Sequence, residues 1–288
     1  MKRINPLIFF GIISFAISSC NISGKPDNGN IDVDSLRIVS LNGTVSEILC
    51  DAGLEKQLVG VDVSSTYPIS LKDIPKVGHN KKIPIEAVLA LNPNLIIGTK
   101  EVPTETVEQF RQAGMRVILV DQEYSIPGSR NMIKSITDSL KLKVKGDSIL
   151  KRFDQDIQQV QAFEAENPKP KVLFIYARGT GTMMVGGNNT QVAKMIQLAG
   201  GLNVAKDFEE YKPLTPESLV NYNPDVILLF SSGLSSLGDK NGFMEVQGVK
   251  QTRAGKEGKI INMDGQLLSG FSPRLPNAIK ELHTKIHE

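Results

Sequence analysis

A short pattern that occurs twice constrains the fold of this 288-residue chain more than any other feature. Residues 83–97 read IPIEAVLALNPNLII, and residues 214–228 read LTPESLVNYNPDVIL. In both copies a Glu near the start is followed seven residues later by the Pro of an Asn-Pro pair. Apolar residues at helical spacing precede this pair, which ends a helix, and a short apolar run typical of a buried strand follows it. The repeat therefore predicts two similar helix–strand units.

The segments around the repeat are also duplicated. A helical pattern that starts at Thr44, its expected N-cap, ends at Gly53, and a similar one ends at Gly200. Strands alternate with helices in each half, which favours mainly parallel sheets. We therefore predict an α/β fold of two Rossmann-like lobes with central, mainly parallel sheets, joined by a long linking helix. Gly146 and Asp147 are expected to separate two helical pieces of that connection.

The predicted domain boundaries follow from these patterns. The N-terminal α/β lobe is expected over residues 37–127, the helical linker over 128–168, and the C-terminal α/β lobe over 169–288. In open α/β sheets, ligands bind in the crevice at the carboxyl ends of the strands. We therefore expect the ligand site in the cleft between the two lobes.

The first twenty residues have the pattern of an export signal. Lys2 and Arg3 are followed by an apolar run that is too short to span a bilayer stably, and then by small residues before Cys20. This pattern resembles a bacterial lipobox, which implies cleavage before Cys20 and lipidation of its thiol; an ordinary signal peptide or a short membrane anchor is the alternative. Residues 21–36 are rich in polar residues and Gly, as in a flexible tether. With Cys20 lipidated, Cys50 has no disulfide partner and is expected to be a structural thiol.

The composition excludes several functions. A net charge of +2 does not favour nucleic-acid binding. No nucleophile elbow, HExxH or Walker motif occurs, and the glycines of residues 178–187 do not match a dinucleotide loop. With His79 the only histidine outside the C-terminal tail, a zinc site of three or four ligands is not expected. We therefore expect a protein without catalytic residues or a catalytic cofactor, and a membrane-tethered enzyme or metal-storage protein is the alternative class.

Three further residues invite a functional interpretation. His79 stands in a predicted loop between Gly78 and a polar run, so it is either a ligand-binding imidazole or a solvent-facing side chain. Glu86 and Glu217 occupy equivalent places near the start of their helices. Each either complements its helix N-terminus or forms one of two acidic contacts to a pseudo-symmetric or dimeric partner.

Several motifs resemble those of one protein family. The lipobox, RIVSLNGTVSEIL, STYP, IPKVGHN, the paired Glu-to-Asn-Pro units and FSPRLPNAI are similar to the substrate-binding proteins of ABC importers for haem, cobalamin and iron-siderophores. The VGHN, RGTGTMMVGGNNT and SGFSPRLPNAI segments look most like the haem-binding branch. In many proteins of that branch, a Tyr that binds haem iron occupies the position of His79. A neutral imidazole is also a common axial ligand of haem.

The resemblance implies roles for individual residues. It implies that His79 coordinates the haem iron, that Met183, Met184 or Tyr176 is a candidate second ligand, and that Tyr67 contacts the porphyrin. Candidate partners of the haem propionates are Lys81, Lys82, Arg178 and Arg274. Glu86 and Glu217 would contact the permease.

The function implied by the resemblance is transport. It implies an exported lipoprotein, anchored to a membrane and facing the periplasm or the cell surface, that captures haem and delivers it to an ABC permease dimer with its ATPase. Haem would be the cargo, and the binding protein would be a monomer. Cobalamin or a ferric siderophore is the alternative cargo.

Overall fold

The first half of the chain forms a sheet of four parallel strands in the order β2-β1-β3-β4. Its strands are β1 (Ile38–Ser40), β2 (Leu58–Val61), β3 (Leu95–Thr99) and β4 (Arg116–Val120), and its helices are α1 (Gly43–Asp51), α2 (Ile85–Leu89) and α3 (Thr104–Gln112). Every residue of β3 is buried, because helices and loops cover both faces of the sheet. The computed structural model describes residues 32–79 and 82–288 of the protein.

The second half forms a mixed sheet in the order β10-β9-β5-β6-β8, with β7 paired to β5. The strands are β5 (Lys171–Ala177), β6 (Met183–Gly186), β7 (Leu202–Asn203), β8 (Tyr211–Pro213), β9 (Val226–Phe230) and β10 (Ile260–Met263). The helices are α6 (Gln191–Leu198), α7 (Pro216–Tyr222), α8 (Ser231–Ser235), α9 (Asp239–Met244), α10 (Arg253–Glu257), α11 (Gly265–Ser269) and α12 (Leu275–His287). Strands β10, β9, β5 and β7 are parallel, whereas β6 is antiparallel to both of its neighbours. The predicted α/β class and mainly parallel sheets are confirmed.

The duplicated sequence pattern folds the same way in both halves. The first copy forms α2 and then β3, and the second forms α7 and then β9. Both helices start next to a Pro, and α7 gains a capping box between Thr215 and Ser218. Asn223 ends α7 in the left-handed conformation, with φ of 39°. The two copies thus place a Glu in the first turn of a short helix and a buried strand behind it.

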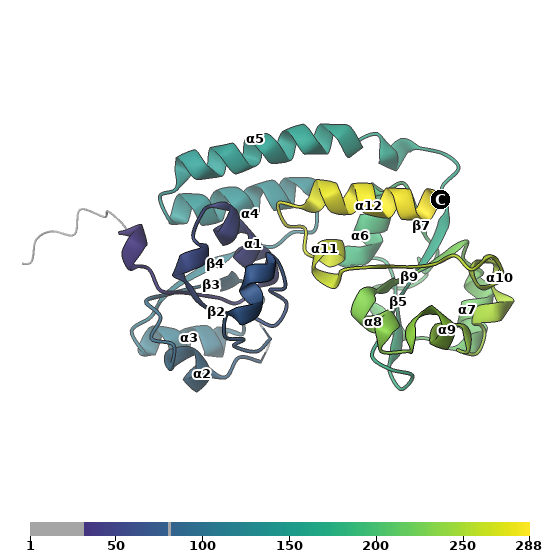
Figure 1. Ribbon diagram of the computed structural model, residues 1–288, viewed down its shortest axis with the longest axis horizontal. Coiled ribbons are helices and arrows are strands. Elements are labelled where there is room, and N and C mark those ends of the chain that lie inside the picture. The colour runs from purple at the N-terminus through teal and green to yellow at the C-terminus, as the bar shows by residue number, and fades with distance from the viewer. Residues whose placement is uncertain (1–31, 80–81) are drawn as a thin grey trace, which may run out of the picture. The chain divides into compact units, whose positions relative to one another are not determined.

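Two long helices, α4 (Ile126–Ser139) and α5 (Lys143–Val160), connect the halves, and α5 lies beside both α4 and α12 (Figure 1). The break between them was predicted at Gly146 and Asp147, and that prediction is wrong. The chain turns at Lys141, whose φ is 57°, and Gly146 lies inside α5. A Cβ on Gly146 would lie 2.2 Å from Thr137 Oγ1, so this glycine serves the close packing of α5 on α4.

The halves share one hydrophobic core. A single cluster contains Ile38 of β1, Phe153 of α5, Val172 of β5 and Leu282 of α12. Residues 32–288 form one compact unit for this reason, and the exact borders of the predicted lobes stay a prediction. The shared core favours limited motion between the halves, because separating them would expose buried apolar surface.

Some predictions concern residues for which the structure gives no description. The predicted signal peptide, Cys20, most of the tether and Lys81 lie outside the described residues. Within the part of the chain that is described, no helix combines the length and the apolar character needed to cross a bilayer.

Candidate functional site

His79 lies on a short turn that the backbone holds in place. Lys82 N donates to His79 O at 2.7 Å, and Val63 N donates to Gly78 O at 3.0 Å. Gly78 has φ of 97°, and a Cβ there would lie 2.9 Å from Lys82 O, so the turn requires glycine before the histidine. The His79 side chain is exposed. These bonds hold the backbone of Gly78 and His79, and the imidazole lies on the surface of the first half.

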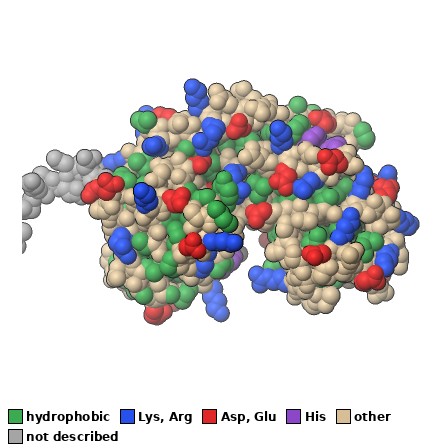
Figure 2. Space-filling view, in the orientation of Figure 1, with side chains coloured by type: hydrophobic (Ala, Val, Ile, Leu, Met, Phe, Trp, Pro, Cys, Tyr) green, Lys and Arg blue, Asp and Glu red, His purple; other side chains and the backbone are tan. Residues whose placement is uncertain are grey.

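This histidine borders a cavity of about 270 Å³ formed by residues of both halves. The lining is mostly polar. It comprises Asn42, Thr44, Asp62, Ser64, His79, Glu101, Gln122, Tyr124, Gln191, Gln266, Ser269 and Gly270. The space-filling view shows a hollow between the two halves, with Lys and Arg side chains on both sides of it (Figure 2). The structure thus has a cavity between the halves beside His79, and its use as the ligand site stays a prediction.

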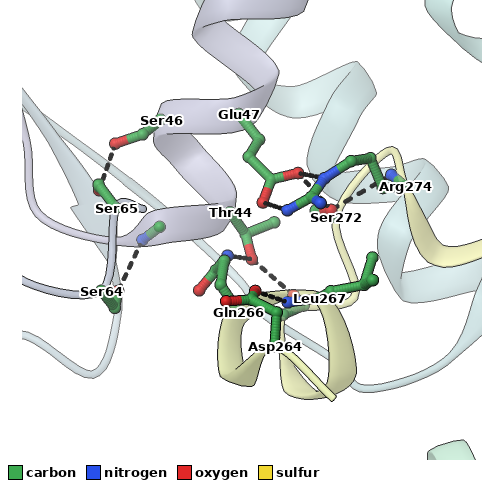
Figure 3. Close-up of polar contacts among 12 residues, drawn as sticks. Thr44, Ser46, Glu47, Ser64, Ser65, Asp264, Gln266, Leu267, Ser272 and Arg274 are labelled. Atoms are coloured by element: carbon green, nitrogen blue, oxygen red, sulfur yellow. Dashed lines mark hydrogen bonds and ion pairs between the residues drawn. The ribbon is translucent and has the colours of Figure 1, made fainter. Parts of the chain in front are cut away.

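Hydrogen bonds between the halves join residues that line this cavity. Thr44 Oγ1 donates to Gly270 O at 2.5 Å, and Gln122 Nε2 donates to the same oxygen at 3.2 Å. Gln266 reaches toward Thr44 from α11, with 3.5 Å between its Nε2 and Thr44 Oγ1 (Figure 3). Thr44 was predicted to cap α1, but Asn42 is the cap, since its side chain accepts from Thr44 N at 2.8 Å. The Thr44 hydroxyl is thus left to join the halves.

Tyrosines gather beside the cavity. Tyr124 lines it, and burial raises the pKa of the Tyr124 phenol. Burial raises the pKa of Tyr211 to about 12, and Tyr124 and Tyr176 are near enough to add to that increase. The Tyr176 and Tyr211 rings meet edge to face at 6.5 Å, and the Arg178 guanidinium lies 6.0 Å from the Tyr176 ring centre. This group offers aromatic surface next to a largely polar cavity.

Tyr67 and Arg274 lie at a different cavity, of about 390 Å³. The Arg274 guanidinium stacks on the Tyr67 ring at 3.6 Å. Its Nε and Nη2 donate to the two oxygens of Glu47 at 2.8 and 2.6 Å (Figure 3). Burial opposes the charge on Arg274, but the bonds to Glu47 outweigh it and raise the pKa of the guanidinium. The structure thus does not bring Tyr67 and Arg274 into one cavity with His79, and their ligand-binding roles stay predictions.

Cys50 lines the same second cavity, and its chemistry matches a structural thiol. Burial raises the pKa of the thiol to about 12, and Glu55, Asp51 and Glu47 contribute to the increase. Because the thiolate is the nucleophile, this environment makes the side chain unreactive at neutral pH. Cys50 is a free cysteine among the described residues.

The other predicted residues occupy three places. Met183 pairs with Ala177 across β5 and β6 and packs against the core of the second half, on the opposite face of β5 from Tyr176. Arg178 is exposed in the hairpin, where its N donates to Thr182 O at 2.8 Å. Glu86 and Glu217 are exposed in the first turns of α2 and α7. Arg178 and the two glutamates are therefore accessible to a ligand or a partner.

Sequence reasoning did not find much of the cavity lining. Gln122 and Tyr124 follow β4, and Gln191 begins α6. Gln266 lies in α11, and none of these four residues belongs to a spaced motif. Their position just after a strand or at the start of a helix was the available signal, because such positions face the crevice in α/β folds.

The comparison with known proteins defines the class. A profile of the family described as Periplasmic binding protein matches residues 38–267. Because this match covers most of the sequence, the chain belongs to the periplasmic binding protein family.

Particular relatives narrow the comparison. The chain is 26% identical over 271 residues to YvrC of Bacillus subtilis, an uncharacterized ABC transporter substrate-binding lipoprotein, and the match covers 91% of this chain and 84% of YvrC. The structure of the periplasmic haem-binding protein RhuT from Roseiflexus sp. RS-1 in its apo form is 35% identical, with a TM-score of 0.84 over 88% of this chain and 98% of RhuT. Periplasmic haem-binding protein BhuT in complex with two haems is 31% identical, with a TM-score of 0.82 over 87% of this chain and 97% of BhuT.

Proposed function

We propose that this protein is the substrate-binding component of an ABC importer, and that it captures haem in the cavity beside His79 and delivers it to the permease. The observation that carries the proposal is the imidazole itself. It stands on a turn fixed by Gly78 and borders a cavity to which both halves contribute. Imidazole is a common axial ligand of haem iron, and the similar proteins RhuT and BhuT bind haem.

The cavity fits partial enclosure of such a ligand. Its volume of about 270 Å³ lies just below the range of about 300–1,000 Å³ usual for ligand pockets, so the macrocycle would extend into the open mouth. The propionates would then meet cationic side chains at the rim. Arg178 is our leading candidate, because it is exposed next to the Tyr176 ring. Lys81 and Met183 stay as further predictions of the ligand contacts.

The proposal is tested by titrating hemin into the protein that lacks residues 1–20 and following the Soret band. Saturable binding with an imidazole-type spectrum is expected. The mostly polar cavity lining is also compatible with the alternative cargo, cobalamin or a ferric siderophore. Saturable binding of one of these, with no saturable binding of hemin, would replace haem as the cargo and leave the class of protein unchanged.

Glu86 and Glu217 are proposed to dock a monomer of this protein onto the two subunits of the permease. Both are exposed, and each lies in the first turn of the equivalent helix of its half. In this proposal the two carboxylates contact cationic residues of the permease. Replacing both by Arg would place like charges at the contact, which costs several kcal/mol, so haem uptake by cells should fall at least about tenfold. Haem binding by the purified variant should be unchanged. Uptake at the normal rate would contradict the docking role, and Glu105→Arg with Glu209→Arg, at two exposed positions, provides a control of equal charge change.

Cys20 is proposed to carry the lipid anchor that holds the protein at a membrane. The sequence pattern before Cys20 supports this, as does the similarity to the lipoprotein YvrC. Replacing Cys20 by Ser removes the thiol to be lipidated, so the exported protein should move from the membrane fraction to the soluble fraction. The fractions are compared by immunoblot, with Cys50→Ser as the control. Retention of the Cys20 variant in the membrane would indicate an uncleaved anchor.

A further inference from the structure

Three side chains far from His79 in the sequence meet at one end of α12. His283 and His287 belong to this helix, and Glu166 follows the short turn Phe163–Ala165 after α5. One ligand atom from each residue lies within 4.8 Å of the other two. The histidines are four positions apart, which places both rings on one face of the helix. The sequence places the two histidines on one helix face. The fold then brings the Glu166 carboxylate next to them.

Hydrogen bonds to the backbone set the tautomer of both rings. His283 Nδ1 lies 3.1 Å from Ala199 O, and His287 Nδ1 lies 2.9 Å from His283 O. A carbonyl oxygen only accepts hydrogen bonds, so each Nδ1 is the donor in its contact, and in the neutral form of each ring the lone pair is then on Nε2. Histidines that bind metals commonly donate their second N–H to a carbonyl or carboxylate in this way. Both imidazoles are therefore prepared to act as ligands through Nε2.

The carboxylate stands at a suitable distance. Glu166 Oε2 lies 3.7 Å from His283 Nε2, which is too long for a hydrogen bond. Two ligands at about 2.0–2.2 Å from a tetrahedral Zn²⁺ ion are about 3.3–3.6 Å apart. A small shift of the exposed Glu166 side chain would bring its oxygen into that range. The His283 ring is already oriented, because it stacks on Phe163 with 3.7 Å between ring centres and 12° between planes.

We propose that Glu166, His283 and His287 bind a divalent transition-metal ion of the Zn²⁺ type, with water completing its coordination. Two imidazoles and one carboxylate suit Zn²⁺, Ni²⁺ or Cu²⁺, whereas Mg²⁺ and Ca²⁺ prefer oxygen ligands alone. The bound ion would tie the segment that leaves α5 to the last helix. It would thereby fix the start of the second half without touching the cavity at His79.

The test is binding of Zn²⁺ alone to the purified full chain in detergent, without an affinity tag, by isothermal titration calorimetry. One equivalent of Zn²⁺ should bind with a Kd in the micromolar range or below. His287→Ala and Glu166→Gln should each weaken binding at least about tenfold, because each removes one of three protein ligands. Both side chains are exposed, so both variants should fold. Zn²⁺ should also raise the Tm of the native chain, and this increase should be lost in His287→Ala.

His79→Ala is the matched control, because it removes an exposed histidine outside the cluster and should leave Zn²⁺ binding unchanged. Absence of saturable binding would overturn the proposal. Binding that His287→Ala leaves intact, or that His79→Ala removes, would do the same. In those cases Glu166 and His283 are only neighbours, with 3.7 Å between Oε2 and Nε2, and the proposal for haem is unaffected.

Discussion

Replacing His79 by alanine is expected to remove the imidazole-type Soret spectrum and to weaken haem binding by about 100-fold or more. Removing the hydrogen-bond partner of a metal ligand typically costs 10–100-fold in affinity, so removing the ligand itself should cost at least as much. Every tenfold loss corresponds to about 1.4 kcal/mol of binding free energy. The side chain is exposed on a turn held by backbone hydrogen bonds, so the variant should fold normally. Hemin titration of both proteins checks the prediction.

Two companion variants sharpen this experiment. His287→Ala removes an exposed histidine that does not line the cavity, so its hemin titration should match that of the native protein. His79→Tyr offers a phenolate ligand at the same position, so it should bind haem with a changed spectrum rather than lose it. An unchanged spectrum and affinity in His79→Ala would exclude His79 as the iron ligand. The cargo would then have to be held by the other side chains of the cleft.

The sequence predicted those parts of the fold that rest on local patterns. The two Glu-to-Asn-Pro units, Gly53 and Gly114 mark helix ends directly, because an Asn-Pro pair or a glycine with positive φ stops a helix wherever it occurs. The break between α4 and α5 could not be read in this way. Gly146 looks like a helix breaker in the sequence, yet its role depends on Thr137 of the facing helix. Only the packed structure reveals that kind of glycine.

The candidate site also combines residues that a local sequence pattern indicates with residues that only the packed structure brings together. His79 could be selected from the sequence, because a lone histidine after a glycine in a loop is a distinctive signal. The hydrogen bonds of Thr44 to Gly270 and of Glu47 to Arg274 join residues that are 226 and 227 positions apart. No local pattern encodes such pairs. Arg274 therefore looked like a free cation for a propionate, whereas the fold supplies a carboxylate for it.

The buried ion pair between Glu47 and Arg274 underlies the second large effect that we expect. Arg274→Ala should lower the free energy of unfolding by about 3–5 kcal/mol, because it leaves the Glu47 carboxylate buried without its partner. The Glu47 side chain is 3% exposed and that of Arg274 is 19% exposed. Ser272 Oγ, which donates to Glu47 Oε2 at 2.7 Å, would remain but carries no charge. The variant should also lose the stacking on Tyr67. Urea unfolding followed by circular dichroism measures the change.

The control is an ion pair at the surface. Arg111 pairs with Glu108 at 2.6 Å, but their side chains are 52% and 51% exposed, so Arg111→Ala should cost no more than about 1 kcal/mol. The double variant Glu47→Met with Arg274→Met should be more stable than Arg274→Ala, because it leaves no buried charge unpaired. If Arg274→Ala is no less stable than Arg111→Ala, the pair does not hold the halves together.

The same variant also separates the two roles open to Arg274. Its Nε and Nη2 are already bonded to Glu47, so a propionate would have to share the guanidinium or displace the carboxylate. Hemin titration of Arg274→Ala at a temperature where it is folded distinguishes these cases. An affinity within about threefold of the native value would assign Arg274 to stability alone. A loss of tenfold or more would mean that haem competes with Glu47 for this cation, and haem binding would then loosen the contact between the halves.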